Sequence, residues 1–215
     1  MSRNYVFAPG EYYHIYARGV EKLAVYREKS DYKNFIERLY LLNTNKAVNV
    51  RDIKHAMTSL GLTSGGVFEF ERDKTLVDIG AYCLMPNHFH ILVREKNENG
   101  KGISRFMQKL MTSYTMYFNK KHNRTGALFG SSFKARHVTD DNHLKYLFAY
   151  IHLNPKEIID DVNRLDRYYY SSYQDYLKIK RVENKIINAT AFPDYFSDDL
   201  ETMEQWIEEF MSPEV

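Results

Sequence analysis

The stretch Ala81-Tyr-Cys-Leu-Met-Pro-Asn-His-Phe-His-Ile-Leu-Val-Arg-Glu95 decides how the chain folds. Its centre, Pro86-Asn87, is typical of a turn between two strands. The apolar runs on either side predict adjacent strands over 77–85 and 88–95. The other elements of the fold are predicted from the segments before and after this strand pair.

The second of these strands carries two histidines, His88 and His90. Because side chains in a strand alternate between faces, both imidazoles point the same way and Phe89 points the other way. Two neighbouring imidazoles on one face are a ready pair of metal ligands. From these residues alone, the alternative is a pair of strand histidines that are satisfied by hydrogen bonds.

Further strands and helices are expected on both sides of the pair. An aromatic run between turn residues predicts a first strand over 11–18, and another strand is expected over 131–138. Apolar residues at helical spacing predict helices over 30–42 and 103–122. The order strand, helix, strand, strand, helix, strand predicts an α+β fold, the ferredoxin-like βαββαβ sandwich, an antiparallel sheet with helices on one face.

The other segments lie outside this unit. Residues 43–74 are polar and contain a glycine-rich break, which indicates an insertion or an elaborated connection. Residues 141–152 predict one more helix, which a proline ends. We expect a main domain over 1–176 and a C-terminal helical extension over 177–215, with an acidic amphipathic helix near its end.

Charge is unevenly distributed along the chain, although the net charge of +2 is nearly balanced. Residues 101–138 include eight lysines and arginines and no acidic residue, whereas 193–215 include eight acidic residues and no basic one. The basic segment also contains interleaved aromatic residues. This combination favours a polyanionic partner, most naturally nucleic acid, over an ordinary solvated helix face.

The single cysteine, Cys83, lies in an apolar strand, which predicts a buried thiol. One cysteine excludes a disulfide within the chain, in keeping with a reducing compartment. No run approaches the roughly 20 apolar residues of a membrane span, and no apolar run follows the first residues as in a signal peptide. The expected location is the cytoplasm.

Phosphodiester cleavage would explain the histidine pair, the basic aromatic segment and the 18 tyrosines together. A divalent ion held by two neutral imidazoles and one oxygen donor can polarise a scissile phosphate. A tyrosine can attack phosphorus and hold the cut end covalently. The ordinary pKa of a phenol is about 10, so a nearby metal or cation would help by stabilising the phenolate.

Several stretches resemble the single-tyrosine transposases that carry an HUH motif (histidine, hydrophobic residue, histidine), in particular their REP-associated branch. The HUH motif corresponds to Leu84-Met-Pro-Asn-His-Phe-His-Ile-Leu-Val93. The other matching stretches are Tyr13–Gly19, Ser113–Asn119, Arg124–Gly130, Phe133–Arg136, Tyr150–Pro155 and Tyr170–Tyr173. They follow the order of the family and cover roughly residues 12–176.

The resemblance implies a DNA transposase that cleaves and rejoins single-stranded DNA at hairpin-flanked sites through a 5′-phosphotyrosine, with Mg²⁺ or Mn²⁺ as cofactor. Relatives include homodimers. By position, His88 and His90 match the metal ligands, and Tyr114 matches the nucleophile. Tyr117 is the rival nucleophile. Asn119 is the candidate third ligand, although relatives place this ligand four residues after the tyrosine and an ideal helix turns by about 140° over five residues.

The candidate DNA contacts are basic residues or histidines near these motifs. They are Arg18, His14, Lys120, Lys121, Arg124, Lys134 and Arg136. The stretch Tyr150–Pro155 is expected to stabilise the fold, because its proline stops a helix. Two alternatives stay open: a domesticated relative that binds DNA hairpins without cleaving them, and a phosphodiesterase with an activated water, which would tolerate Tyr114→Phe.

Overall fold

The computed structural model describes residues 6–62, 65–159, 162–194 and 200–211. Its centre is a four-stranded antiparallel sheet with the strand order β2-β3-β1-β4. The strands are β1 (Tyr12–Arg18), β2 (Val77–Met85), β3 (His88–Glu95) and β4 (Lys134–His137). This order is the one that a ferredoxin-like βαββαβ sandwich requires. The fourth strand is shorter than the predicted 131–138.

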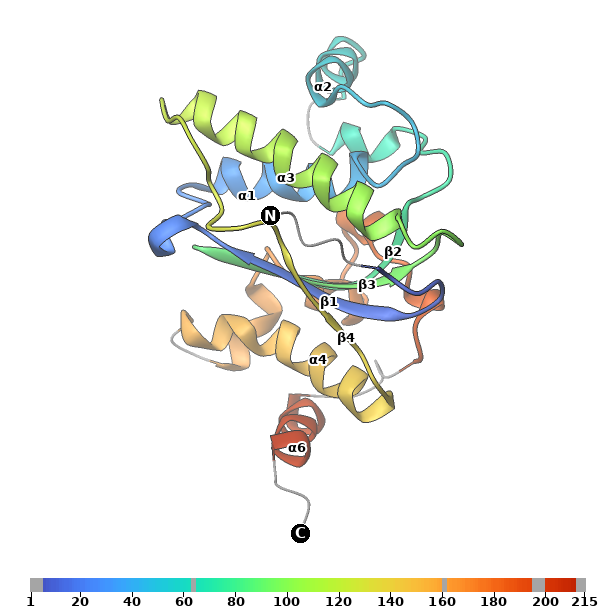
Figure 1. Cartoon of the computed structure of the whole chain (residues 1–215). Helices are drawn as coiled ribbons and strands as arrows, with labels where there is room; N and C mark the ends of the chain where they lie inside the picture. The colour runs from blue at the N-terminus through green and yellow to red at the C-terminus, as the bar shows by residue number, and fades with distance from the viewer. Residues whose placement is uncertain (1–5, 63–64, 160–161, 195–199, 212–215) are drawn as a thin grey trace.

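Helices lie on both faces of the sheet (Figure 1). One face is covered by α1 (Lys29–Leu41) and α3 (Gly102–Lys121), the two helices of the βαββαβ unit. The other face is covered by α4 (Asp141–Leu153), on which α6 (Leu200–Met211) packs. The predicted placement of helices on one face therefore holds for the βαββαβ unit, and α4 closes the second face.

The connecting segments are built from short helices. The predicted insertion over 43–74 contains α2 (Val50–Ser59) and a 3₁₀ helix, η2 (Gly66–Glu69). The other short helices are η1 (Val20–Lys22), η3 (Asn154–Glu157), η4 (Val162–Arg167), α5 (Tyr173–Tyr176), η5 (Val182–Ile186) and η6 (Ala189–Ala191). The domain boundary after residue 176 stays a prediction, but Ile186 and Met203 beyond it are buried in the cores of the two faces.

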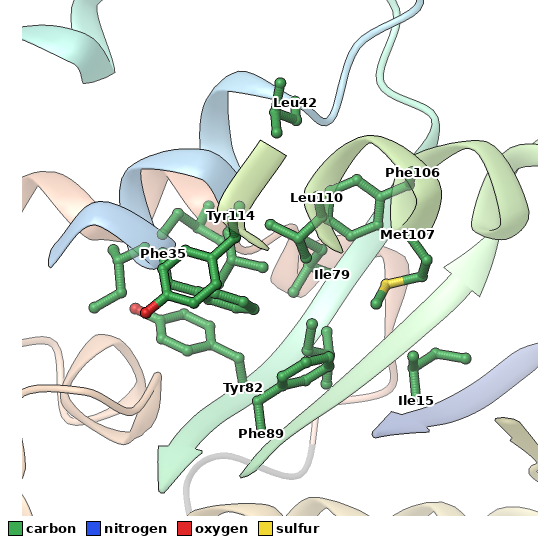
Figure 2. Packing of buried hydrophobic residues seen from close by; sticks show 14 of the residues in the cluster. Ile15, Phe35, Leu42, Ile79, Tyr82, Phe89, Phe106, Met107, Leu110 and Tyr114 are labelled. Carbon is green, nitrogen blue, oxygen red and sulfur yellow. The ribbon is translucent and has the colours of Figure 1, made fainter. Parts of the chain in front are cut away.

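Each face of the sheet has its own core, and β3 contributes to both. Phe89 and Ile91 belong to the core beneath α1 and α3, part of which Figure 2 shows. Leu92 belongs to the core beneath α4. Because strand side chains alternate, His88 and His90 lie on the α4 face with Leu92.

Two predictions from composition can be compared with the structure. Cys83 is a fully buried free thiol in β2, as predicted. None of the helices in the described part of the chain is long and apolar enough to cross a bilayer.

Glu95, at the end of β3, fixes the start of α3. Its buried carboxylate accepts hydrogen bonds from the backbone amides of Gly102 and Ile103 at 3.1 and 2.9 Å. The Asn97 amide donates to it as well, at 2.8 Å. Amides in the first turn of a helix have no partner inside the helix, so a carboxylate there both satisfies them and interacts favourably with the helix dipole.

We expect Glu95→Ala to lower the free energy of unfolding by about 3 kcal/mol, because the substitution leaves buried amide donors without an acceptor. Urea denaturation measures this quantity. Glu98→Ala, at an exposed position in the same connection, is the matched control and should change it by less than about 0.5 kcal/mol. Equal effects of the two substitutions would show that Glu95 does not anchor α3.

Candidate active site

A pocket of about 530 Å³ opens on the α4 face of the sheet. The two histidines of β3 line it together with residues of β1, β4 and the C-terminal end of α4. The lining residues with polar side chains include Tyr16, Arg18, Glu21, Lys22, His88, His90, Ser131, Lys134, Tyr150, Asn154 and Glu157. The pocket thus brings together imidazoles, a tyrosine, an amide and cationic side chains.

Each of the two imidazoles has a hydrogen-bond partner at its Nδ1 atom. Nδ1 of His88 lies 2.6 Å from Oδ1 of Asn87, and Nδ1 of His90 lies 2.7 Å from Nε2 of His14. The ring centroids of His88 and His90 are 5.0 Å apart. With Nδ1 engaged, Nε2 is the nitrogen of each ring that remains for another partner.

Burial keeps the histidine pair neutral. It lowers the pKa of His88, as does the positive charge of Arg18, against the opposing effects of a hydrogen bond with Asn154 and of the Glu157 carboxylate. Burial also holds the pKa of His90 well below its ordinary value, with the neighbouring imidazoles acting in the same direction. Since only the neutral imidazole has a lone pair for a metal, both histidines are competent ligands at neutral pH.

Tyr150 and Asn154 reach the histidine pair from the opposite wall. The Tyr150 ring centroid lies 5.3 Å from that of His90, and the side chain is half-buried. Asn154 follows four residues later at the C-terminal cap of α4, and helix positions four apart share a face. Its Nδ2 donates to the backbone carbonyl of Tyr150 at 2.9 Å. The amide oxygen is therefore the atom with capacity for an ion.

Tyr114 is not part of this site, and its prediction as the nucleophile is corrected. It lies on α3, fully buried in the core on the opposite face of the sheet, where its ring packs against Phe35 (Figure 2). Its hydroxyl donates a 2.6 Å hydrogen bond to the carbonyl of Val25, and burial raises its pKa. A buried phenol that is committed to a backbone carbonyl cannot reach a phosphate.

The other residues predicted on α3 also lie away from the histidines. The hydroxyl of Tyr117 lies 3.2 Å from the Asp31 carboxylate of α1. The Asn119 side chain fixes the turn after α3: Nδ2 donates to the carbonyl of Gly126, and Oδ1 accepts from Arg124. The prediction of Asn119 as the third metal ligand is therefore corrected too.

Three of the predicted DNA contacts lie on the face of the histidine pair. Arg18 and Lys134 line the pocket. Arg136 is exposed on β4, and its register opposite His14 puts it on the same face. His14 itself is buried, with a side chain only 6% exposed, so its prediction as a DNA contact is corrected.

The remaining predicted contacts, Lys120, Lys121 and Arg124, lie on α3 or just after it, away from the pocket. Lys121 is paired with Glu28 and Asp31 at 2.6 and 2.8 Å. These two carboxylates and His122 are close enough together to hold a cation, but the ammonium group of Lys121 already pairs with both carboxylates. The histidine pocket is therefore the better candidate for a metal site.

Tyr150 and Asn154 are the site residues that sequence reasoning missed. A signal for them was present, because a tyrosine followed four residues later by a polar ligand is the spacing expected of relatives. Tyr114 and Asn119 are five residues apart and do not meet it.

The chain is similar to known transposases in sequence and in fold. Residues 65–154 match the family model described as "Transposase IS200 like", a range that includes the β2–β3 hairpin and ends at Asn154. This match confirms the resemblance to HUH transposases. A solved structure, "Structure of the REP associates tyrosine transposase bound to a REP hairpin", aligns over 85% of this chain and 89% of its own, with a TM-score of 0.50 and 11% identity. It supports the ferredoxin-like fold. No curated protein matches the chain in sequence.

Proposed function

We propose that this chain, which carries an IS200-like transposase domain over residues 65–154, cleaves and rejoins single-stranded DNA with Tyr150 as the nucleophile. The observation that carries the proposal is the convergence of Tyr150 and Asn154 with the two histidines in one pocket. The REP hairpin bound to the similar structure favours a DNA hairpin as the substrate of this chain. A cytoplasmic location, expected from the sequence, and a homodimer, which occurs among the relatives that the chain resembles, are both compatible with this role.

The donors in the pocket fit Mg²⁺ or Mn²⁺. Two neutral imidazoles and the Asn154 amide oxygen supply three ligands, and oxygen donors suit both Mg²⁺ and Mn²⁺. The carboxylate of Glu157 lines the same pocket and adds negative charge. Bound there, a divalent ion would polarise the scissile phosphate and stabilise the charge that develops on it.

The residues of the chain supply the nucleophile and the contacts to the DNA backbone. The Tyr150 hydroxyl oxygen forms a bond to phosphorus while the bond from phosphorus to the 3′ oxygen breaks. The phenol loses one proton, and the departing 3′ oxygen gains one. The cut 5′ end stays on Tyr150, so attack by a 3′-hydroxyl rejoins the strand without ATP. Arg18 and Lys134, which line the pocket, would bind neighbouring phosphates.

Labelled hairpin oligonucleotides test the proposed function. Single-stranded hairpins labelled at the 5′ or the 3′ end are incubated with the protein and Mn²⁺ and separated on a denaturing gel. We expect a covalent protein–DNA adduct, which does not form when EDTA is present to remove the metal. Cleavage without an adduct would point to an activated water as the nucleophile. Binding without cleavage would favour a domesticated hairpin-binding protein.

The basic residues of the pocket should contribute to binding in a salt-dependent way. We expect Lys134→Ala to weaken hairpin binding and to lower the slope of log affinity against log salt by about 0.7, the value for one phosphate contact on a single strand. Fluorescence anisotropy at several salt concentrations measures this slope. Lys120→Ala, which removes an exposed cation from α3 outside the pocket, should leave it unchanged. The reverse result would place the DNA on the α3 side.

A further inference from the structure

His14 lies behind His90 on the sheet. In the register between β1 and β3, His14 is opposite Leu92 and Tyr16 is opposite His90, so the two histidines are diagonal neighbours on one face. Nε2 of His14 lies 2.7 Å from Nδ1 of His90, and the ring centroids are 5.0 Å apart. Each side chain is only 6% exposed, so this hydrogen bond is shielded from water.

A hydrogen bond between two neutral imidazoles needs one donor and one acceptor, and the direction decides what His90 can do. If His14 donates, His90 carries its proton on Nε2, and that nitrogen has no lone pair for an ion. If His90 donates from Nδ1, its Nε2 lone pair is available, and His14 carries its own proton on Nδ1. Only the second direction lets His90 bind a metal through Nε2.

The neighbouring ligand has a partner whose direction is unambiguous. An amide oxygen can only accept, so the 2.6 Å contact with Oδ1 of Asn87 makes Nδ1 of His88 the donor. The orientation of this amide is supported by its Nδ2, which donates to the carbonyl of Lys22 at 3.4 Å. His14 occupies the equivalent place for His90, but as an imidazole it can act in either direction.

We propose that His14 is a positioning residue: it accepts a hydrogen bond from Nδ1 of His90 and thereby holds His90 in the tautomer that binds the ion. The inference rests on the proposed function, because it concerns the same metal site. His14 touches neither the ion nor the DNA in this account and acts only through His90. Such hydrogen-bond partners fix ring orientation and raise ligand basicity.

Nitrogen NMR of the metal-free protein labelled in its histidines tests the tautomer directly. We expect the His90 proton on Nδ1 in the wild-type protein. His14→Phe keeps a ring in the buried position but removes the acceptor, and we expect the His90 proton to shift toward Nε2. His14→Gln offers an amide oxygen as acceptor and should restore the wild-type tautomer. A wild-type His90 protonated on Nε2 would overturn the proposal without need of any variant.

Metal affinity gives a second readout that requires no DNA. Titration with Mn²⁺, followed by the electron paramagnetic resonance of the free ion, should show binding weakened about 10- to 100-fold in His14→Phe, the usual loss for such a partner. His14→Gln should recover most of it. His137→Phe, a half-exposed histidine on β4 that pairs with Glu11, is the matched control and should bind like wild type. Thermal unfolding in EDTA checks that each variant is folded.

His88→Ala separates this inference from the function on which it rests. If His88→Ala binds Mn²⁺ as tightly as wild type, the proposed metal site is wrong. If His88→Ala loses the ion while folded His14→Phe binds it normally, the metal site is right and His14 is a packing residue only, which overturns the inference. If His14→Phe does not fold, two other results test the proposal: the tautomer of His90 in the wild-type protein and the Mn²⁺ affinity of His14→Gln.

Discussion

Tyr150→Phe will abolish the covalent adduct and slow strand cleavage by roughly 10³-fold or more, because the substitution removes the attacking oxygen. The phenylalanine ring keeps the packing of Tyr150 beside His90, so the pocket and its donors should be retained. Adduct formation under single-turnover conditions with Mn²⁺ measures the effect. Hairpin binding in EDTA should be close to that of wild type, which separates lost chemistry from lost binding.

Two other tyrosines serve as controls for this substitution. Tyr146 lies one turn earlier on α4, and its ring stacks on Tyr150 at 5.8 Å between centroids. Tyr146→Phe should keep the adduct. Tyr114→Phe should also keep it, while losing about 1 kcal/mol of stability with the hydrogen bond to Val25. If a folded Tyr114→Phe variant forms no adduct while Tyr150→Phe still does, then Tyr114 is the nucleophile, as the sequence predicted.

His88→Ala should reduce adduct formation at low Mn²⁺ concentration by at least about 10²-fold, because it removes one of the three proposed protein ligands. Raising the Mn²⁺ concentration should restore part of the rate, since the loss is one of affinity. The rate of adduct formation is measured over a range of Mn²⁺ concentrations.

The control for His88→Ala is His55→Ala, at an exposed position on α2, which should behave like wild type. If His88→Ala forms the adduct at the wild-type rate at every Mn²⁺ concentration, then the histidine pair does not hold the catalytic ion. A rate that stays low at saturating Mn²⁺ would instead mean that His88 has a role beyond metal affinity.

The fold was predictable because its signals are local. The turn at Pro86-Asn87 and the alternation along β3 predict the hairpin and the face shared by His88 and His90, which the structure confirms. Local sequence patterns could not predict that a second layer of helices covers the other face of the sheet. The sheet has two faces, and α4 covers the face that the βαββαβ unit leaves open.

The prediction of Tyr114 as the nucleophile failed because helical periodicity and family resemblance pointed in different directions. Tyr114 belongs to the same apolar stripe as Phe106 and Leu110, and all three are fully buried, as the helical spacing alone predicts. The stretch containing Tyr150 was interpreted as a structural helix end. The role proposed for Tyr150 depends on α4 crossing the histidine face, which is a property of the tertiary structure and not of the spacing.

For the basic residues too, the sequence predicts some features and only the tertiary structure shows the others. In the structure, alternation along β1 and its pairing with β3 put Arg18 on the face that carries the histidines, and the pairing of β4 with β1 adds Lys134 to it. The same alternation placed His14 on this face, but it could not show that the side chain is buried behind His90. Burial depends on what packs above the strand, and here that is α4.

The most direct test of the account is the position of the covalently bound nucleotide. The wild-type adduct is trimmed with nuclease and digested with trypsin, and the modified peptide is fragmented by mass spectrometry. We expect a nucleotide on Tyr150, in the peptide 146–156, with Tyr146 in the same peptide unmodified. A nucleotide on Tyr114, or efficient cleavage with no modified tyrosine, would contradict it.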